Sequence, residues 1–355
     1  PPRSTLFPYT TLFRSLYGGA RHWLYRAKLY TDVRLVCAPE LQAAFFGGDW
    51  DNFCYPRHDL DFTFLRAYEN GQPAKVEHYL KIDPDGVDDG ELVFVSGHPG
   101  RTARLHTVAG LEWERDVSYP AKLERSRHTR EVLRQYSARS AEAARSARQM
   151  IYGLGNSLKA MEGEHAGLRD PELMAIKLAD EKALRAAVAA DPALEARYGG
   201  AWERAAAAYA WARAHDKERL WKAEMPGSRF TNMALTLVRY GQEIRKKDGE
   251  RMPGYHDAQL ADLLRPIQSQ APYYKDMEEV LLADALTRLQ TELGAGDPFV
   301  AAALQGQTPA AAAAAAISGT RLDDLEFRKQ LLAEKGAKVA KTPDSLLDLA
   351  RRLEP

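Results

Sequence analysis

Residues 45–66 read FFGGDWDNFCYPRHDLDFTFLR, and this stretch carries most of the information in the sequence about the fold and the site. A Gly-Gly pair opens a loop that leads into DFTFLRAY at 61–68, whose alternating apolar residues predict a β-strand. The loop contains four acids: Asp49, Asp51, Asp59 and Asp61. Carboxylates at this density can perform acid–base hydrolysis, ligate a cation or form turns. The residues alone favour turn formation.

A β domain is predicted for residues 16–120, around this stretch. Short runs rich in β-branched or aromatic residues and bounded by turn formers occur as VRLVCA (33–38), AAFF (43–46) and ELVFVSG (91–97). Asn70-Gly71 directly follows the strand predicted from the opening stretch, and this dipeptide indicates a hairpin.

An α-helical domain is predicted for residues 121–355, where the composition shifts to alanine, arginine, glutamate and leucine. Apolar residues recur there with the helical period. Breaks that divide the predicted helices occur at Asp170-Pro171, Asp191-Pro192, Gly199-Gly200, Pro226-Gly227, Pro253-Gly254 and Ala271-Pro272. The alanine run 310–316 predicts a helix face of small residues. The predicted fold class is therefore α+β.

Composition excludes several classes of partner. A chain of 355 residues is long enough for two domains. The 49 basic and 49 acidic residues balance, so no overall positive field attracts nucleic acid or an anionic membrane. No run of about 18 apolar residues predicts a membrane span. Two cysteines, Cys37 and Cys54, are too few for a disulfide framework and lack the spacing of a metal site.

The first fifteen residues, PPRSTLFPYTTLFRS, resemble a translated sequencing adapter more than part of a gene. Residues 1–15 are therefore expected to be an artefact and are excluded from the prediction of the fold. On this interpretation the natural N-terminus, together with any leader peptide, lies upstream of Leu16 and is missing from the sequence.

The motif GGDxDNFxxPRxxxDFxFLRxYENGxP, which begins at Gly47, resembles the signature of a family of bacterial serine dipeptidyl peptidases, family S46, which includes dipeptidyl peptidases 7 and 11. The similarity continues through HYLKIDPDGVDDGELVFVSGHPGRTARLHTVAGL (78–111), IYGLGNSLKAMEGEHAGL (151–168) and LEFRKQLL (325–332). Agreement across such separate motifs extends the resemblance from about Arg21 to the end of the chain.

The resemblance implies a serine exopeptidase that releases dipeptides from the free N-terminus of oligopeptides. Its implied fold is a chymotrypsin-like β-barrel, present here in part, with a large inserted α-helical domain. The aspartate that closes the NFxxPRxxxD motif is the acid of the family's catalytic triad, and this position is Asp61. The resemblance also implies a periplasmic or secreted protein and a possible homodimer, without cofactor or metal.

Asn52 and Phe53 occupy the positions with which the family contacts the α-ammonium of the substrate, and Asn156 is a second candidate contact from the helical domain. An amide oxygen can accept a hydrogen bond from an ammonium without burying a counter-charge. The residues themselves leave alternatives open, since Asn52 could form a turn and Asn156 could serve helix packing.

Two histidines and two serines invite assignment to the triad, but their contexts differ from the family pattern. His58 lies only three residues before Asp61, and His98 lies in a predicted tight turn, so both are expected to be structural. Ser96 and Ser318 precede glycine but lack the GNSGSP-like setting of the nucleophile. The chain is therefore expected to be an internal fragment without the catalytic histidine and serine, and to be inactive as supplied.

Two further functions remain open from the sequence. The helical half could be a binding or scaffold module, with the β region as a degenerate remnant. Alternatively, the acids at 49–61 could form a carboxylate-based hydrolase or a cation site.

Overall fold

The computed structural model describes residues 9–16, 21–44, 52–54, 56–94, 105–223 and 228–354. The chain forms two compact units. Unit 1 comprises Pro1–Phe46 and Cys54–Leu105, and unit 2 comprises Gly47–Phe53 and His106–Pro355. The class is α+β, as predicted, because small antiparallel sheets lie in unit 1 and helices dominate unit 2. The domain limits predicted at residues 15 and 120 stay predictions.

Two antiparallel sheets lie in unit 1. One pairs β1 (Tyr9–Leu16) with β2 (Arg21–Lys28), and the other has the order β3 (Asp32–Cys37), β4 (Phe64–Glu69), β5 (Gln72–Pro73). The β4–β5 hairpin turns at Asn70-Gly71 with φ angles of 52° and 76°, which confirms the hairpin that this dipeptide predicted. All of strand β1 except its last residue, Leu16, falls within the stretch expected to be an artefact, and the origin of that stretch stays a prediction.

Three predicted strands of unit 1 need correction. The AAFF run begins in a short helix, α1 (Leu41–Ala44), in which the amides of Ala43 and Ala44 donate to the Glu40 carbonyl. Leucine, glutamine and alanine favour helix here over the predicted strand. Strand β4 starts at Phe64, three residues later than predicted, and residues 91–94 form no regular element. Residues 45–46 and 95–97 lie outside the described residues.

Unit 2 contains a long succession of helices. Those described are α2 (Val108–Trp113), η2 (Glu114–Ser118), α3 (Tyr119–Ser137), α4 (Ala141–Leu168), α5 (Pro171–Ala189), α6 (Pro192–Tyr198), α7 (Ala201–Ala214), α8 (Asp216–Glu218), η3 (Arg219–Ala223), α9 (Arg229–Glu243), η4 (Asp248–Glu250), α10 (Asp257–Leu264), α11 (Lys275–Leu293), α12 (Pro298–Leu304), α13 (Pro309–Ser318), α14 (Leu325–Gly336) and α15 (Ser345–Leu353). None of these helices combines the length and apolar character needed to cross a membrane.

Several helices of unit 2 begin where the sequence places an oxygen-bearing side chain before proline. The Asp170 carboxylate accepts from the backbone N–H of Glu172, and Asp191 makes the same contact with Ala193 at the start of α6. Proline at the next position costs no hydrogen bond, since the first amides of a helix have no partner within it. The breaks predicted at 170–171 and 191–192 are therefore confirmed as helix starts.

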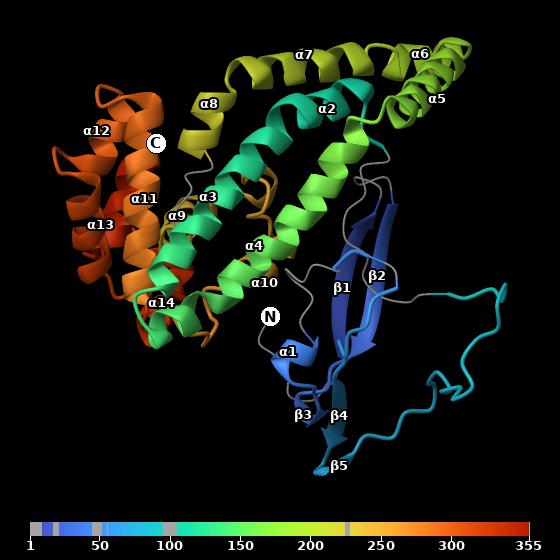
Figure 1. The fold of residues 1–355 in the computed structure, drawn as a ribbon, viewed down its shortest axis with the longest axis horizontal. Helices are drawn as coiled ribbons and strands as arrows, with labels where there is room; N and C mark the ends of the chain where they lie inside the picture. Colours follow the sequence, from blue (N-terminus) through green and yellow to red (C-terminus); the bar gives the residue numbers. More distant parts are fainter. Residues whose placement is uncertain are drawn as a thin grey trace. The chain divides into compact units, whose positions relative to one another are not determined.

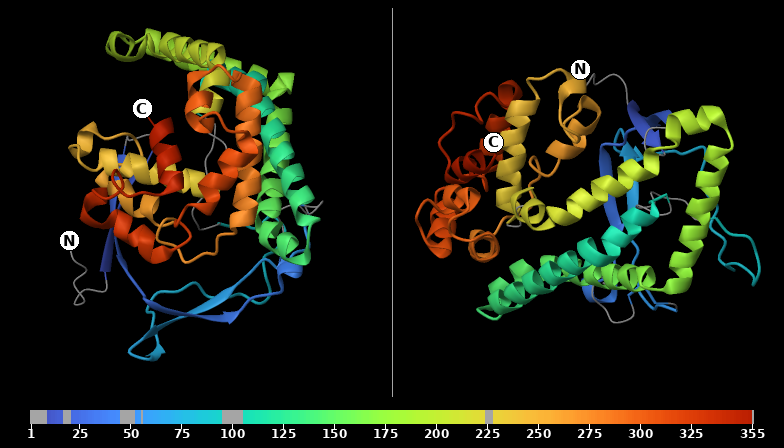
Figure 2. Two further views of the ribbon diagram at one scale, coloured as in Figure 1. Left: turned by 90° about the vertical axis from the view of Figure 1, so that its left-hand side faces the viewer. Right: turned by 90° about the horizontal axis from the view of Figure 1, so that it is seen from above.

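Two apolar clusters hold unit 2 together. The larger joins α9 with α11–α15, and its members include Phe230, Leu237 and Leu286, all fully buried. The alanine run lies in α13, where Ala313 is fully buried in that cluster, so its prediction as a small-residue helix face is confirmed. The smaller cluster joins α3, α4 and α11 around Leu133. Figures 1 and 2 show α3 and α4 running side by side in every view.

Candidate functional site

The side chains of Asn52 and Asn156 meet within unit 2, although 104 residues separate them in the sequence. Asn52 Nδ2 donates a hydrogen bond of 3.0 Å to Asn156 Oδ1. Asn52 lies in a turn and is only 4% exposed, whereas Asn156 is partly buried on α4. An amide oxygen has two lone pairs, so Asn156 Oδ1 retains acceptor capacity for a second donor.

Helix α4 holds Asn156 on a rigid element. The helix begins at Ser140, whose hydroxyl accepts from the backbone N–H of Ala143, and it continues for 28 residues. On either side of Asn156, Gly155 and Leu158 are buried, and α4 packs along α3. The position of the Asn156 amide is therefore set by helix packing and not by a loop.

Phe53 follows Asn52 with a backbone conformation that large side chains avoid. Its φ angle is 63°, in the left-handed region, which costs a bulky residue about 1–3 kcal/mol. The ring is 64% exposed, beside the buried Asn52. Such strain is retained mainly at functional positions. An exposed aromatic residue thus directly follows the buried Asn52 in the chain, and aromatic faces attract cations.

Asp61 lies in unit 1, at a tight turn that precedes β4. The amide of Phe62 donates to the Leu60 carbonyl with Asp61 between them, and the Leu60 amide donates to the Ala43 carbonyl. Asp61 is exposed, and among the described residues its carboxylate has no hydrogen-bonding or ion-pair partner. The turn thus fixes the backbone around a carboxylate that is available to accept a donor.

Asp59, the other described acid of the opening loop, differs from Asp61. Asp59 forms an ion pair with Arg57 in the same loop, so its charge is balanced locally. Asp49 and Asp51 lie outside the described residues. Among the residues that the structure describes, no three His, Cys, Asp or Glu side chains gather as a metal-binding group. Of the two loop carboxylates that the structure describes, Asp61 is therefore the better suited to orient another group.

The remaining sequence candidates are placed as follows. His58 is exposed in the irregular segment before Asp61. The Ser318 hydroxyl donates to the Ala315 carbonyl at the end of α13. His98 and Ser96 lie outside the described residues. Among the described residues, neither Ser318 nor His58 contacts an acid or base of a catalytic triad. The expectations that His58 is structural and that Ser318 is not the nucleophile stay predictions.

Lys159 lies close to Asn156 in the sequence, which did not single it out. Lys159 is partly buried on α4, and its Nζ atom is shielded from solvent without a hydrogen-bonding partner among the described residues. Lys159 lies three residues after Asn156, so the two share a helix face. That spacing within GNSLK was the signal available in the sequence.

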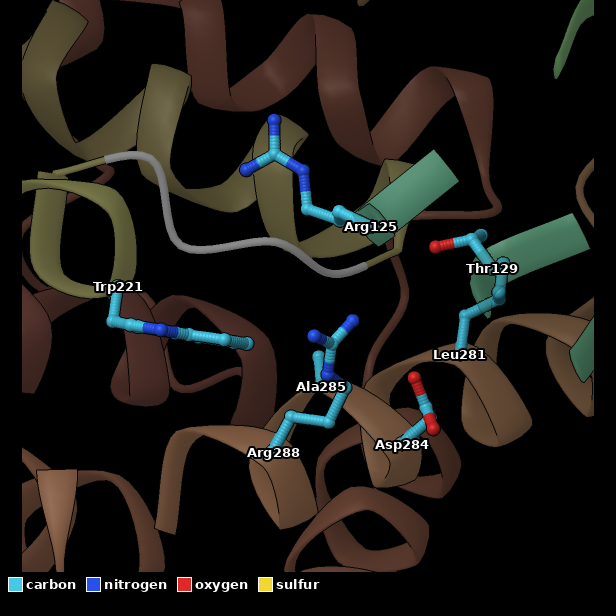
Figure 3. Close-up of a pocket in the computed structure, with 7 residues that line it drawn as sticks. All are labelled: Arg125, Thr129, Trp221, Leu281, Asp284, Ala285 and Arg288. Carbon is cyan, nitrogen blue, oxygen red and sulfur yellow. The ribbon is translucent and has the colours of Figure 1, made fainter. Parts of the chain in front are cut away.

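A small cavity between α3, η3 and α11 is too small to be a ligand-binding site. It is lined by Arg125 and Thr129 of α3, Trp221 of η3, and Asp284 and Arg288 of α11, as Figure 3 shows. Its volume of about 40 Å³ is far below the several hundred Å³ that small-molecule sites occupy. The Arg288 guanidinium lies 5.2 Å from the centre of the Trp221 ring. These contacts hold η3 against α11.

Comparison with known proteins agrees with the motifs. The family model described as Peptidase S46 matches residues 9–355. An Asp/Glu-specific dipeptidyl-peptidase of Shewanella putrefaciens is 30% identical over 269 residues, which cover 71% of this chain and 36% of that protein. A dipeptidyl-peptidase 7 of Phocaeicola vulgatus is 28% identical over 176 residues, covering 46% of this chain and 24% of the relative. The chain thus spans about a third or less of these relatives.

The fold has a counterpart among solved structures. The crystal structure of Porphyromonas endodontalis DPP11 in complex with the dipeptide Arg-Glu superimposes with a TM-score of 0.62 at 19% identity, covering 98% of this chain and 51% of that one. At this identity the likeness concerns the fold alone. The match of the family model over nearly the whole sequence is the finding that decides the family. The chain belongs to the Peptidase S46 family.

Proposed function

We propose that this chain is part of a serine dipeptidyl peptidase that releases dipeptides from the free N-terminus of oligopeptides. The proposal includes a chymotrypsin-like β-barrel to which unit 1 contributes, and it assigns the histidine and serine of the triad to residues other than these 355. These residues by themselves are then inactive. The proposed chemistry requires no cofactor or metal.

The observation that carries the proposal is the contact between Asn52 and Asn156. Two amides from distant parts of the sequence meet at one place, where Asn156 Oδ1 is an acceptor, and the exposed residue Phe53 directly follows Asn52 in the chain. Such a group suits a peptide α-ammonium, which offers N–H donors and a positive charge. A peptide whose chain continues beyond that nitrogen has no ammonium there, so recognition of this kind favours an exopeptidase.

Asp61 is proposed as the triad acid. Its carboxylate would accept the Nδ1–H of the histidine, fix the tautomer of the ring and stabilise the imidazolium that forms when the serine loses its proton. The absence of a partner for Asp61 among the described residues supports this role, because an acid already engaged in an ion pair, as Asp59 is, serves it less well. The periplasmic or secreted location and the homodimer rest on the family resemblance and remain part of the proposal.

Peptide binding tests the proposal directly. Wild-type chain is titrated calorimetrically with Ala-Ala and with N-acetyl-Ala-Ala, and we expect only the free peptide to bind. Replacing Asn52 by Ala removes one amide and should weaken binding of Ala-Ala about tenfold, the typical effect of losing a hydrogen bond to a charged group. Asn232, which is exposed on α9, provides the control variant Asn232→Ala. Equal binding of the two peptides would contradict the proposal.

A further inference from the structure

A cavity of about 170 Å³ lies between α12, α13 and α15 of unit 2. Gln305 and Gln307 line it from the loop between α12 and α13, and Arg352 lines it from the last turn of α15. Alanines of α13 form an apolar wall. A cavity can hold one water molecule in about 10–15 Å³, so this cavity has room for a small organic ion.

The Arg352 guanidinium is held in position without a counter-charge. Its Nε–H donates a hydrogen bond of 3.0 Å to the Ala302 carbonyl. Within the described part of the chain, its two terminal nitrogens make no hydrogen bond or ion pair. Partial burial lowers the pKa of Arg352 below its ordinary value, because it removes water that solvates the charged form. An anion in the cavity would supply the missing charge.

The acids beside the cavity are already paired. Asp348 also lines the cavity, and its carboxylate accepts from the Arg351 guanidinium three residues further along α15. Asp348 attracts Arg352 as well, but burial has the larger effect on the pKa of that arginine. Glu354, which follows α15, pairs with Arg239 of α9. Two arginines and one aspartate therefore leave a net positive charge beside the cavity.

Both lysines of a wider cavity in unit 2 have acidic partners. That cavity has a volume of about 390 Å³ and is lined by residues of α8, η3 and α11, among others. Lys217 forms an ion pair with Glu292 at 3.3 Å. Lys222 contacts Glu218 at 2.9 Å and Asp297 at 3.1 Å. The cavity at the end of α15 is therefore the better candidate for a charged ligand.

We propose that Arg352, Gln305 and Gln307 bind a small aliphatic monocarboxylate in this cavity. A guanidinium presents parallel N–H donors that match the two oxygens of a carboxylate. The carboxamides of the two glutamines offer further N–H donors, and among the described residues no hydrogen bond engages them. Ala312 and Ala316 present methyl groups to the cavity, which suit a short alkyl chain and limit its length.

Gln305 occupies its place with a backbone conformation that favours glycine. Its φ angle is 49°, in the left-handed region. Its backbone N–H donates to the Ala301 carbonyl at 2.8 Å and so ends α12, which glycine would do equally well. The end of the helix therefore does not require the glutamine side chain, whose carboxamide remains available for a ligand.

The test compares propionate with propionamide, which has a similar shape without the charge. Saturation-transfer NMR on the wild-type chain at pH 7 and constant ionic strength measures both dissociation constants. We expect propionate to bind about tenfold more tightly, the typical effect of a hydrogen bond to a charged group. Arg352→Gln should abolish this preference. Arg265→Gln, at an exposed arginine that ends α10, is the matched control and should keep it.

Gln305→Gly is a second variant that suits the backbone, because glycine adopts the left-handed conformation readily. It should fold as the wild type does and bind propionate about threefold more weakly, through loss of one hydrogen bond. Unchanged affinity in this variant would contradict the arrangement. Together with the wild-type titrations, it decides the matter even if Arg352→Gln does not fold.

Three further results would overturn the inference. The first is equal binding of propionate and propionamide by the wild-type chain, and the second is a preference for propionate that persists in Arg352→Gln. The third is inorganic phosphate binding as tightly as propionate, which would indicate a general anion site. These results are independent of the proposed function, because neither asparagine of the pair lines the cavity.

Discussion

Asp59 and Asp61 show how two acids of one loop acquire different chemistry. Asp59 is paired with Arg57, whereas Asp61 lies within a tight turn and has no partner among the described residues. The sequence placed both in the same acidic stretch, and only the family motif distinguished them. The ion pair of Asp59 adds a physical distinction that the motif does not contain.

The role of Asp61 leads to a prediction for the longer enzyme. Replacing Asp61 by Asn keeps the shape of the side chain but favours the wrong tautomer of the histidine, so kcat should fall by about 10⁴. The measurement is steady-state hydrolysis of a dipeptidyl substrate by the enzyme that contains these residues. Asp89→Asn, at another exposed acid of unit 1, is the control and should retain activity. Activity of Asp61→Asn within a factor of about ten of wild type would remove Asp61 from the triad.

The sequence could identify single candidate residues, but it could not predict which of them are in contact. The contact between Asn52 and Asn156 spans 104 residues, and it depends on how a turn meets a helix. The local sequence patterns around Asn52 and around Asn156 do not indicate that these two residues are in contact. The left-handed conformation of Phe53 was equally hidden, because glycine would be the expected residue there.

Helix starts were the most predictable elements, since each depends on two or three adjacent residues. Asp170 and Asp191 accept backbone N–H groups ahead of proline at α5 and α6, as the sequence indicated. The start of β4 was less predictable, because strand limits depend on the partner strand: β4 pairs with β3 from Phe64 onward. The π-helix η2, which joins α2 to α3, has no signal of comparable strength in the sequence.

The contact between α11 and α9 predicts that the stability of the fold depends on pH. Glu278 of α11 is 1% exposed, and its carboxyl accepts from the backbone N–H of Phe230 at the start of α9. Burial raises the pKa of Glu278 above its ordinary value of 4.5. Because the folded state binds the proton more strongly than the unfolded state, this group's contribution to stability is greatest below pH 4.5 and declines as the pH rises through the raised pKa.

Glu278→Gln should remove that dependence, since glutamine keeps an acceptor for Phe230 without a charge. Urea unfolding of unit 2 at several pH values from 4.5 upward should show the variant gaining stability relative to wild type as the pH increases. The neighbouring, partly exposed Glu279 supplies the control Glu279→Gln, for which we expect a parallel profile to wild type. A constant difference between Glu278→Gln and wild type across this range would show that Glu278 does not titrate there.

The two units differ in how much apolar surface they bury. In unit 2, the cluster of α9 and α11–α15 contains fully buried side chains such as Leu237 and Leu286. In unit 1, apolar strand residues such as Leu35 and Leu65 are 65% and 62% exposed. Burial of apolar surface is the main favourable contribution to stability, so the units should differ in local stability.

Hydrogen exchange measures this difference. Backbone amides of β3 and β4 should exchange at least about tenfold faster than those of α9 and α11, because fewer apolar contacts oppose their opening. Mass spectrometry of peptides from each element, after exchange of the intact chain at neutral pH, gives both rates in one experiment. Equal protection of the strands and of α9 would indicate that unit 1 gains stability from sources other than its own packing.

Because Gly47–Phe53 belongs to unit 2, the asparagine pair depends on two separate segments of the chain. The chain leaves the strand-bearing unit, contributes Asn52 to the helical one, and returns at Cys54, so the two asparagines belong to one unit but not to one continuous segment. A helical segment transplanted into another protein as residues 106–355 would carry Asn156 alone. Exchange of residues 106–355 alone would therefore separate the two asparagines, and only a segment that spans both positions keeps them together.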